Sequence, residues 1–461
     1  MTEVKKQGHG DIADLPEGFK MTELGLLPEE WRMVRLGDLA RQGMLVIRNG
    51  FAQGQHNESG KGVPHLRPFN IDDNGNLTMH QVKYVPPPQL DSPYWLRAGD
   101  IVFNNTNSEE LVGKTGYFDL DVPCVLSNHM TLIRVMDASV LEPYWLARIL
   151  HFFYQYGVFR SLCRRHVNQA SVSLQRLLSL YLPLPPLPEQ RVIAHVLRTV
   201  QRAKEATERV IQATRELKKS LMRYLFTYGP VPVEEAEKVP LKETEIGLVP
   251  EHWEVVRLGD VTHFESGKRE KGGGKTTGEV WSIGGEHITE DGQLDFSTPR
   301  FISREFYSKM HKGKVKLGDI LVCKDGARTG KSAFVEKMPL TGLAVNEHVF
   351  IVRSGNDNRL VPRFLGFWFR SEQAWQQIYS AYHGLIGGIT QQQIREFIIP
   401  LPPLSEQHEI ARIFQAVDQK VQAEEARKQA LEALFKTLLH NLMTGKIRVK
   451  DVILPETKET I

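Results

Sequence analysis

The sequence predicts an α/β (α+β) fold with two similar globular domains, joined by two long helices that form an antiparallel coiled coil with pseudo-twofold symmetry. The first observation is a repeat: residues 22–39 read TELGLLPEEWRMVRLGDL, and residues 244–261 read TEIGLVPEHWEVVRLGDV. A second repeated pair follows, PLPPLPEQ at residues 183–190 and PLPPLSEQ at residues 400–407. The third observation is a helical periodicity after each proline motif. Two copies of one unit in one chain form a pseudo-twofold object.

Each globular domain carries the same order of strand-like and helix-like segments. Short apolar runs follow matching Gly-Asp pairs and are typical of strands. Pro143 and Pro362 each begin a helix-like segment, at a position where a helix start tolerates proline. Each domain has roughly 150 residues, which is a usual domain size. The matched strand-like runs are residues 101–103 with 320–322, and residues 128–134 with 347–353.

Each proline motif is followed by about forty residues with apolar side chains at steps of three and four. Such a stripe cannot be buried by one helix alone, so each long helix needs the other as its partner. In the second helix charged residues interrupt the stripe, and a neighbouring apolar stripe (Phe414, Val421, Phe435, Leu442) predicts that the buried face shifts around the helix. The first stripe comprises Ile193, Val196, Val200, Ala203, Thr207, Val210, Thr214, Leu217, Leu221 and Tyr224. The second comprises Ile410, Ile413, Val417, Leu431, Leu434 and Leu438, interrupted by Lys420, Glu424 and Arg427.

These patterns predict seven segments along the chain. Gly445 is the expected stop of the second helix, because glycine is favoured just after a helix end. The segments are a mobile N-terminal tail (1–21), a first globular domain (22–182), a first long helix (183–228), a linker (229–243), a second globular domain (244–399), a second long helix (400–445) and a C-terminal tail (446–461).

Composition is that of an ordinary globular protein, with 41% hydrophobic and 25% charged residues. The net charge of +3 is too small to indicate nucleic-acid binding by itself, so a surface that binds nucleic acid must be formed by local basic patches. The three cysteines are widely spaced, which favours neither a disulfide framework nor a cysteine zinc site and fits a reducing cytoplasm. We see no secretory signal and no apolar run of the ~20 residues that span a bilayer, so no membrane association is expected.

The two duplicated motifs carry a resemblance to a known family. The pattern T-E-[IL]-G-L-[LV]-P-E-x-W-x-[VM]-V-R-L-G-D-[LV] occurs twice, and P-L-P-P-L-[PS]-E-Q precedes a long helix twice. Together with the closing Leu-Met-Thr-Gly-Lys-Ile-Arg-Val, they resemble the specificity (S) subunit of Type I restriction-modification enzymes. The similarity runs from about residue 22 to residue 449. The first copy departs from the pattern at residues 225–229, where LFTYG replaces the LMTGK of residues 442–446.

This resemblance implies a function. Two target-recognition domains each read one half of a split sequence in double-stranded DNA, and the two helical regions space them and bind two methyltransferase (M) subunits. Two restriction motor-nuclease (R) subunits complete the restriction form. The chain itself has no catalytic centre and binds no cofactor, whereas S-adenosylmethionine belongs to the methyltransferase, and ATP and Mg belong to the motor-nuclease. A methylation-only or other phage-defence system remains an alternative.

Motifs for catalysis are incomplete. DSPY at residues 91–94 lacks the second proline of an adenine methyltransferase loop, and GARTGKS at residues 326–332 is one residue short of a phosphate-binding loop. Neither a metal-dependent nuclease pattern nor His-Glu-x-x-His occurs, so we predict no catalytic residue and no metal site. A self-contained DNA-modifying enzyme and a scaffold or carbohydrate-binding protein are the rival interpretations.

Residues that contact DNA are expected in polar loops, because Arg and Lys read guanine, Asn and Gln read adenine, and small polar or basic groups hold phosphates. Solvated loops have the same composition, so each residue is only a candidate. Arg328, on a glycine-flanked turn after a strand, is the favoured base contact. The candidates in the first domain are Arg48, Asn49, Gln53, Gln55, Asn105, Asn107, Lys114, Arg164, Arg165 and Asn168. Those in the second domain are Lys268, Arg269, Lys271, Lys275, Lys324, Arg328, Lys331, Gln391 and Gln392.

Two further sets of residues recur at repeated positions. Trp31 and Trp253 are expected in the core rather than stacked on a flipped base. The acidic residues of the proline motifs suit the first turn of a helix, where the helix dipole favours negative charge. The family resemblance adds subunit binding on these helical regions, with Glu189, Gln190, Glu406 and Gln407 as candidates.

Overall fold

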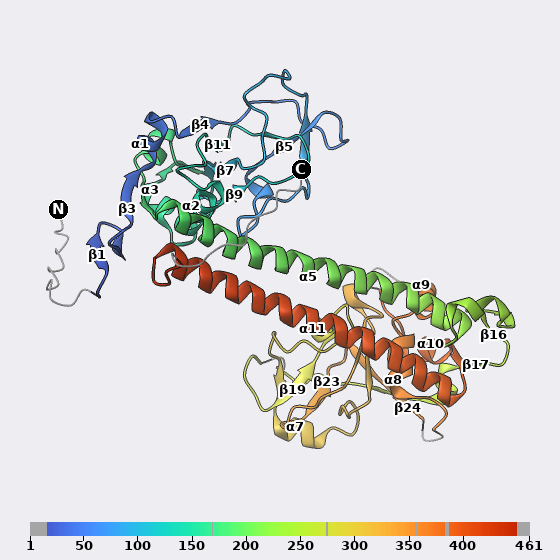
Figure 1. Ribbon diagram of the computed structural model, residues 1–461. Coiled ribbons are helices and arrows are strands. Elements are labelled where there is room, and N and C mark those ends of the chain that lie inside the picture. The colour runs from blue at the N-terminus through green and yellow to red at the C-terminus, as the bar shows by residue number, and fades with distance from the viewer. Residues whose placement is uncertain (1–15, 168, 273–274, 356–357, 383–386, 450–461) are drawn as a thin grey trace. The chain divides into compact units, whose positions relative to one another are not determined.

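The chain forms two compact units, each with one copy of the globular domain and one part of each long helix (Figure 1). The computed structural model describes residues 16–449 apart from 168, 273–274, 356–357 and 383–386. Unit 1 comprises Met1–Ala206 and Arg427–Ile461, and unit 2 comprises Thr207–Ala426. Both units mix sheets and helices, which confirms the predicted fold class.

The two long helices are α5 (Leu187–Tyr228) and α11 (Leu404–Met443), each about 60 Å long at 1.5 Å per residue. Within unit 1, Ile193 near the start of α5 shares a core with Leu442 near the end of α11. Within unit 2, Phe226 near the end of α5 packs on Phe414 near the start of α11, with ring centroids 6.2 Å apart. In each unit the two helices therefore pair in antiparallel sense, as predicted.

The buried face of α5 differs from the predicted stripe in the middle of the helix. Ile193 is buried as expected, but the side chains of Val210 and Leu217 are 40% and 53% exposed. Thr207 is buried as predicted, and Ile211, which lies outside the predicted stripe, is buried as well. A strict seven-residue repeat drifts around a helix of 3.6 residues per turn, so the contact face moves off the predicted positions. In α11 the shift to the neighbouring stripe is confirmed, because Phe414, Val421, Phe435 and Leu442 are buried.

The central sheet of each globular domain has four antiparallel strands in the same order. The runs at residues 101–103 and 320–322 are confirmed as strands, and Pro143 and Pro362 each begin a helix that packs beside the sheet. In unit 1 the order is β4 (Leu45–Asn49), β11 (Met130–Val135), β7 (Ile101–Asn104) and β9 (Thr115–Tyr117), with helix α2 (Pro143–Gln155). In unit 2 it is β18 (Thr262–Ser266), β24 (Val349–Ser354), β21 (Ile320–Cys323) and β22 (Ser332–Phe334), with helix α8 (Pro362–Trp368).

Smaller sheets and turns are also duplicated. Three-stranded sheets are formed by β5 (Val63–Leu66), β6 (Lys83–Val85) and β10 (Val125–Leu126), and by β19 (Val280–Ile283), β20 (Phe301–Ile302) and β23 (Leu343–Val345). Two-stranded pairs are β1 (Phe19–Thr22) with β2 (Gly25–Pro28), β15 (Leu241–Thr244) with β16 (Gly247–Pro250), β3 (Arg32–Arg35) with β14 (Tyr181–Leu184), and β17 (Glu254–Arg257) with β25 (Ile398–Leu401). Unit 1 adds β8 (Thr106–Asn107), β12 (Arg164–Arg165) and β13 (Ala170–Ser171).

The remaining helical segments are short. They are α1 (Leu36–Arg41), α3 (Val158–Leu162), α4 (Leu174–Leu178), α6 (Leu258–Val261), α7 (Arg304–Lys309), α9 (Glu372–Ala381) and α10 (Gln391–Arg395). Tight 3-10 turns are η2 (Pro68–Asn70), η3 (Val233–Lys238), η4 (Gly285–His287) and η5 (Gly326–Arg328). Gly445 follows the end of α11 with φ of 68°, which confirms it as the helix stop.

A buried tryptophan fixes each long helix to its globular domain. Trp31 Nε1 donates to Glu189 Oε2 at 2.9 Å, and Trp253 Nε1 donates to Glu406 Oε2 at 2.8 Å. Both indoles are completely buried, so the prediction that these tryptophans belong to the core is confirmed. The carboxylates of Glu189 and Glu406 lie in the first turn of their helices, as predicted. Each also accepts a hydrogen bond from an indole N–H.

The glutamine that follows each of these carboxylates reinforces the same joint. Gln190 Oε1 accepts from the Glu142 backbone N–H at 2.9 Å, and Gln407 Oε1 accepts from that of Val361 at 2.8 Å. Their Nε2 atoms donate to the carbonyls of Pro185 and Pro402, at 2.9 and 2.8 Å. Both glutamines are buried. Their internal bonds therefore account for the repeated Glu-Gln pair without any partner protein.

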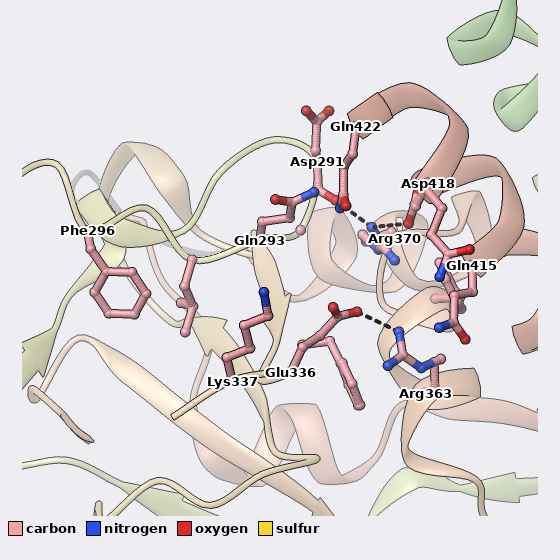
Figure 2. Close-up of a pocket in the computed structure, with 15 residues that line it drawn as sticks. Asp291, Gln293, Phe296, Glu336, Lys337, Arg363, Arg370, Gln415, Asp418 and Gln422 are labelled. Atoms are coloured by element: carbon pink, nitrogen blue, oxygen red, sulfur yellow. Dashed lines mark hydrogen bonds and ion pairs between the residues drawn. The ribbon is translucent and has the colours of Figure 1, made fainter. Parts of the chain in front are cut away.

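In unit 2 a half-buried arginine bridges the globular domain and α11 (Figure 2). Arg370 Nη1 donates to the Asp291 carbonyl at 2.5 Å and lies 3.7 Å from Asp418 on α11. Burial lowers the pKa of Arg370, and the charges of Asp418 and Asp291 oppose that shift. Figure 2 shows these side chains around a cavity of about 270 Å³, which Arg363 and Glu336 border as a second ion pair. Both arginines that line the cavity thus pair with an acidic side chain that also lines it.

We predict that Glu406→Ala destabilises unit 2 by about 1–3 kcal/mol, because it leaves the buried Trp253 indole N–H without an acceptor. Urea unfolding followed by tryptophan fluorescence measures the change. Glu406→Gln should retain most of the stability, since its amide oxygen can still accept. Glu409→Ala is the matched control on the same helix, because Glu409 pairs with exposed Arg412. An unchanged midpoint for Glu406→Ala would contradict the assignment.

Candidate nucleic-acid interface

A groove with a volume of about 710 Å³ opens at one edge of the unit 1 sheets. Four chain segments meet there: the η2 turn, the loop between β7 and β9, the residue before β11 and the residue before β13. Apolar, aromatic and polar side chains together cover its walls, as is usual of a ligand-binding surface. Its side chains include Arg67, Phe69, Asp73, Asn104, Asn107, Ser108, Lys114, His129 and Gln169.

An arginine stacked on an exposed phenylalanine forms one wall of this groove. The Arg67 guanidinium lies 4.3 Å from the Phe69 ring centroid, and Phe69 is 46% exposed. The Arg67 backbone N–H donates to Asn70 Oδ1 at 3.0 Å, which holds the η2 turn. Burial lowers the pKa of Arg67 from its ordinary value, while the charge of Glu58 raises it. A planar guanidinium fixed on a ring is suited to bidentate recognition of a base edge or a phosphate.

Two buried asparagines beside strand β7 are held by internal hydrogen bonds. Asn105 Nδ2 donates to Thr131 Oγ1 at 2.9 Å, and that hydroxyl donates to Asn49 Oδ1 at 3.2 Å. Asn104 Nδ2 donates to the Leu111 carbonyl at 2.8 Å. Asn105 is buried, so of the two predicted asparagines in this loop only Asn107, which is half-buried, faces the groove.

A lysine ion pair holds the same turn in both units. Lys114 Nζ lies 2.7 Å from Asp73 Oδ1 in unit 1, and Lys331 pairs with Glu290 at the matching position in unit 2. Lys114 is buried, and its ammonium group holds the pKa of the Asp73 carboxyl below its ordinary value. Both predicted lysines therefore have an internal partner, and Lys114 positions the turn that borders the groove of unit 1.

The matching place in unit 2 is occupied by Arg328. Its Nη1 donates to the carbonyls of Gly285 and Glu286 at 3.1 Å each, and to that of Ile288 at 3.2 Å. The side chain is nevertheless exposed, on the predicted glycine-flanked turn η5 after strand β21. Arg328 is thus held by the η4 turn, and it stands where unit 1 has the open groove.

Three loops of unit 2 meet beside Arg328. His348 Nδ1 lies 2.7 Å from Asp325 Oδ1, and Arg269 Nε lies 2.6 Å from Glu347 Oε1. Lys324 lies over the Phe350 ring, 5.6 Å from its centroid. Arg269 therefore brings the predicted basic loop next to the turn that carries Arg328.

The other predicted DNA contacts are dispersed. Arg48 and Asn49 lie on β4, and Gln53 and Gln55 lie in the loop that follows it. Arg164 and Arg165 are exposed on β12, where Arg165 pairs with Glu109 at 2.7 Å. Lys268, Lys271 and Lys275 are exposed, and Asn168 lies outside the described residues. Gln391 and Gln392 are in the first turn of α10, where Gln392 lines a separate hollow with Gln373 and Glu396.

Sequence reasoning missed Arg67, Phe69, His129 and Gln169. One signal was available, because His129 and His348 occupy the same place before the last sheet strand of each repeat. No sequence motif marks the Arg67–Phe69 pair, because it forms a groove wall only together with loops that are distant in sequence.

The predicted subunit contacts Glu189, Gln190 and Gln407 are buried in the joints described above, whereas Glu406 is half-buried and also contacts His252 at 2.7 Å.

Among the described residues, no cluster of His, Cys, Asp or Glu is arranged to hold a metal ion. Within the same part of the chain, no helix has both the length and the apolarity needed to cross a membrane. Cys124, Cys163 and Cys323 are free, and burial raises the pKa of the Cys124 thiol to about 12.

Comparison with known proteins agrees with the duplicated architecture. The family described as Type I restriction modification DNA specificity domain matches residues 28–215 and again residues 250–433. The chain belongs to this family. The resemblance noted from the repeated motifs is thereby confirmed, with one copy of the family domain in each repeat.

Relatives of this specificity-domain chain match over nearly its whole length. A protein of Methanocaldococcus jannaschii, provisionally named type I restriction enzyme MjaX specificity subunit, is 30% identical over 94% of this chain and 97% of its own length. The type I restriction enzyme EcoBI specificity subunit of Escherichia coli is 27% identical over 83% of this chain and 78% of its own.

Solved structures show the same fold. The S subunit of a Type I restriction-modification system from M. genitalium matches with a TM-score of 0.57 at 14% identity, covering 89% of this chain and 96% of that one. A chain from work on complex assembly and conformational transition of the type I R-M system matches with a TM-score of 0.53 at 17% identity, covering 91% and 99%.

We predict that Lys114→Ala loosens the turn at residues 72–76, because Asp73 loses its ammonium partner. Hydrogen exchange followed by mass spectrometry should show faster amide exchange in that turn and little change in the core strands. Lys61→Ala, at an exposed lysine of the same unit, is the control. Equal exchange in both variants would show that the ion pair does not hold the turn.

Proposed function

We infer that the chain is the specificity subunit of a Type I restriction-modification system, which binds a bipartite DNA sequence and carries out no reaction itself. One observation carries the inference. The two units keep the same framework at the candidate interface, with Lys114 matching Lys331 and His129 matching His348, but the walls differ. Equal frameworks with different walls are suited to reading two different half-sites.

The chemistry of each wall fits the edges of DNA bases. In unit 1, Arg67 offers a bidentate donor for guanine, and the amides of Asn107 and Gln169 match adenine. In unit 2, Arg328 and Lys324 offer donors for guanine. The exposed lysines of the loop at residues 268–275 suit phosphates, which fix register without reading sequence.

Partners and cofactors follow from this function. We propose that two methyltransferase (M) subunits bind the chain and modify adenines with S-adenosylmethionine, and that two motor-nuclease (R) subunits add ATP- and Mg-dependent cleavage. Duplication supports the number two, because a repeated chain offers the same partner two equivalent surfaces. Access to DNA and these partners places the complex in the cytoplasm. A methylation-only or other phage-defence assembly would use the same chain without the nuclease.

Reconstitution tests the proposal directly. The purified chain is combined with its methyltransferase subunit and a methyl donor on a randomised DNA library, and methylated sites are sequenced. One split motif with a fixed gap is expected, and the chain alone should transfer no methyl group. Methyl transfer by the chain alone would favour a self-contained DNA-modifying enzyme, and methylation without sequence preference would exclude the specificity function.

Arg67→Ala and Arg328→Ala should each relax recognition at one base pair, by about 1–3 kcal/mol, and in different half-sites. The measurement is the motif profile of the reconstituted complex. Arg41→Ala and Arg304→Ala, at solvent-facing arginines of units 1 and 2, are matched controls. A uniform loss of methylation at all sites would identify the arginine as a phosphate contact.

Inserting seven residues into both α5 and α11 should lengthen the run of unread base pairs between the half-sites, because we propose that these helices set that spacing. Seven residues add about 10 Å of helix, or roughly three base pairs of duplex. Methylome sequencing of cells that carry the variant gives the gap directly. Insertion of seven residues in the exposed loop near Leu340 is the control. A motif with the original gap would argue against helices as the spacer.

A further inference from the structure

One edge of the joint between the unit 2 domain and its two helices is ionic. Asp418 on α11 lies 3.7 Å from Arg370 in the domain, and it also pairs with Lys218 on α5 (Figure 2 shows Arg370 and Asp418). Arg215, one turn earlier on α5, lies 3.6 Å from the Asp291 carboxylate in the domain. These five residues, here called the Asp418 network, connect the domain to both helices.

The matched edge of unit 1 is aromatic. The alignment that matches residues 225–229 with 442–446 places Phe435 at the position of Lys218, and the repeated proline motifs place Gln201 at that of Asp418. The Arg148 guanidinium lies 5.6 Å from the Phe435 ring centroid. A ring supports a cation without a counter-charge beside it.

Both edges hold the same turn of the globular domain. Arg148 Nη1 donates to the Asn74 carbonyl at 2.7 Å, and Arg370 Nη1 donates to that of Asp291, the matched residue, at 2.5 Å. The two units therefore fix one turn to the helices with different chemistry, an arginine over a ring in unit 1 and an arginine in an ion network in unit 2.

The opposite edge of the unit 2 joint is firmly packed. There Trp253 donates to Glu406, and Phe226 packs on Phe414. Asp418 follows Glu406 along α11 by about 18 Å, at 1.5 Å per residue. The cavity of about 270 Å³ lies beside Asp418, so packing between the domain and α11 is incomplete at the ionic edge. The joint thus has the form of a hinge at one edge and a weaker contact at the other.

The Asp418 network is also costly to bury and open to screening. Burial lowers the pKa of Lys218, the charge of Arg370 lowers it further, and the charge of Asp418 opposes the shift. The side chains of Arg215 and Asp291 are 44% and 52% exposed, so dissolved ions reach this pair. Burying charges offsets part of their attraction, and salt weakens the remainder.

We propose that the Asp418 network is a salt-sensitive latch that holds the second globular domain against the helices. When the latch opens, this domain turns about the joint of Trp253 and Glu406, while the first domain stays held by its aromatic edge. The use of the latch rests on the proposed function. A second domain that turns reaches half-sites at more than one distance, so the closed latch keeps the unread gap at one length.

Hydrogen exchange of the full chain, followed by mass spectrometry, tests the latch. Between about 0.05 and 0.5 M salt, the turn at residues 289–293 should exchange at least about tenfold faster, and the matched turn at residues 72–76 should change little. Asp418→Asn leaves two cations without their shared counter-charge, so exchange should be fast already at low salt. Glu409→Gln, at an exposed acid that pairs with Arg412 on the same helix, is the control. Equal salt responses of the two turns, or unchanged exchange in Asp418→Asn, would overturn the proposal.

Transfer of the unit 1 residues should have the opposite effect. Lys218→Phe combined with Asp418→Gln places a ring and an amide beside Arg370, as Phe435 and Gln201 stand in unit 1. The turn at residues 289–293 should then stay protected at both salt concentrations. A salt response that persists in this variant would show that the Asp418 network is not its source.

Spin labels distinguish turning of the domain from loosening of the turn alone. They are placed at Leu340→Cys, in an exposed loop of the domain, and at Ala416→Cys, on an exposed position of α11, in a chain that carries Cys163→Ser because the other two cysteines are buried. The distance distribution should be narrow at low salt and should broaden at high salt and in Asp418→Asn. Fast exchange with an unchanged label distance would contradict turning of the domain.

The effect on spacing is measured in the complex reconstituted with the methyltransferase subunit. The wild-type chain should methylate a split motif with one gap, and Asp418→Asn should add sites with a shorter or longer gap. One gap in Asp418→Asn, despite a broadened label distance, would overturn control of spacing by the latch. Absence of any split motif with the wild-type chain would remove the proposed function, whereas the exchange rates and label distances would still decide whether the latch exists.

Discussion

A buried hydrogen bond between an indole and a carboxylate is the constraint on which both units depend. It joins the beginning of each repeat to the first turn of a long helix, through Trp31 with Glu189 and Trp253 with Glu406. A buried carboxylate needs a compensating positive charge. Arg448 supplies it to Glu189, with Nε 2.7 Å from Oε1, and this contact raises the pKa of the arginine. Glu406 has His252 instead, with Nε2 2.7 Å from Oε1, so the joint is kept while the second partner of the carboxylate comes from different parts of the chain.

A second duplicated ion pair stabilises each central sheet. Arg134 pairs with Asp100 at 2.6 Å in unit 1, and Arg353 pairs with Asp319 at 2.7 Å in unit 2, where both aspartates are buried. Breaking a buried pair costs far more than altering an exposed loop, because it leaves an uncompensated charge. The recognition domains thus have an interior that tolerates little change and a loop edge that tolerates much.

The sequence alone predicted what depends on repetition and local chemistry. It placed the strands at residues 101–103 and 320–322, the two long helices and the buried tryptophans, because motifs and periodicity specify these directly. It failed where burial depends on the tertiary partner. Leu217 fits the helical stripe but is exposed, and no sequence pattern indicated that Arg328, the favoured base contact, donates to three carbonyls of a turn about forty residues earlier. The Arg67–Phe69 wall could not be anticipated, because distant loops form the groove.

Comparison of the two repeats separates structural residues from functional ones without any other sequence. Residues kept in both copies and buried, such as Gln190 and Gln407, are explained by their internal bonds. Groove residues that differ between the copies are explained if each copy reads different bases.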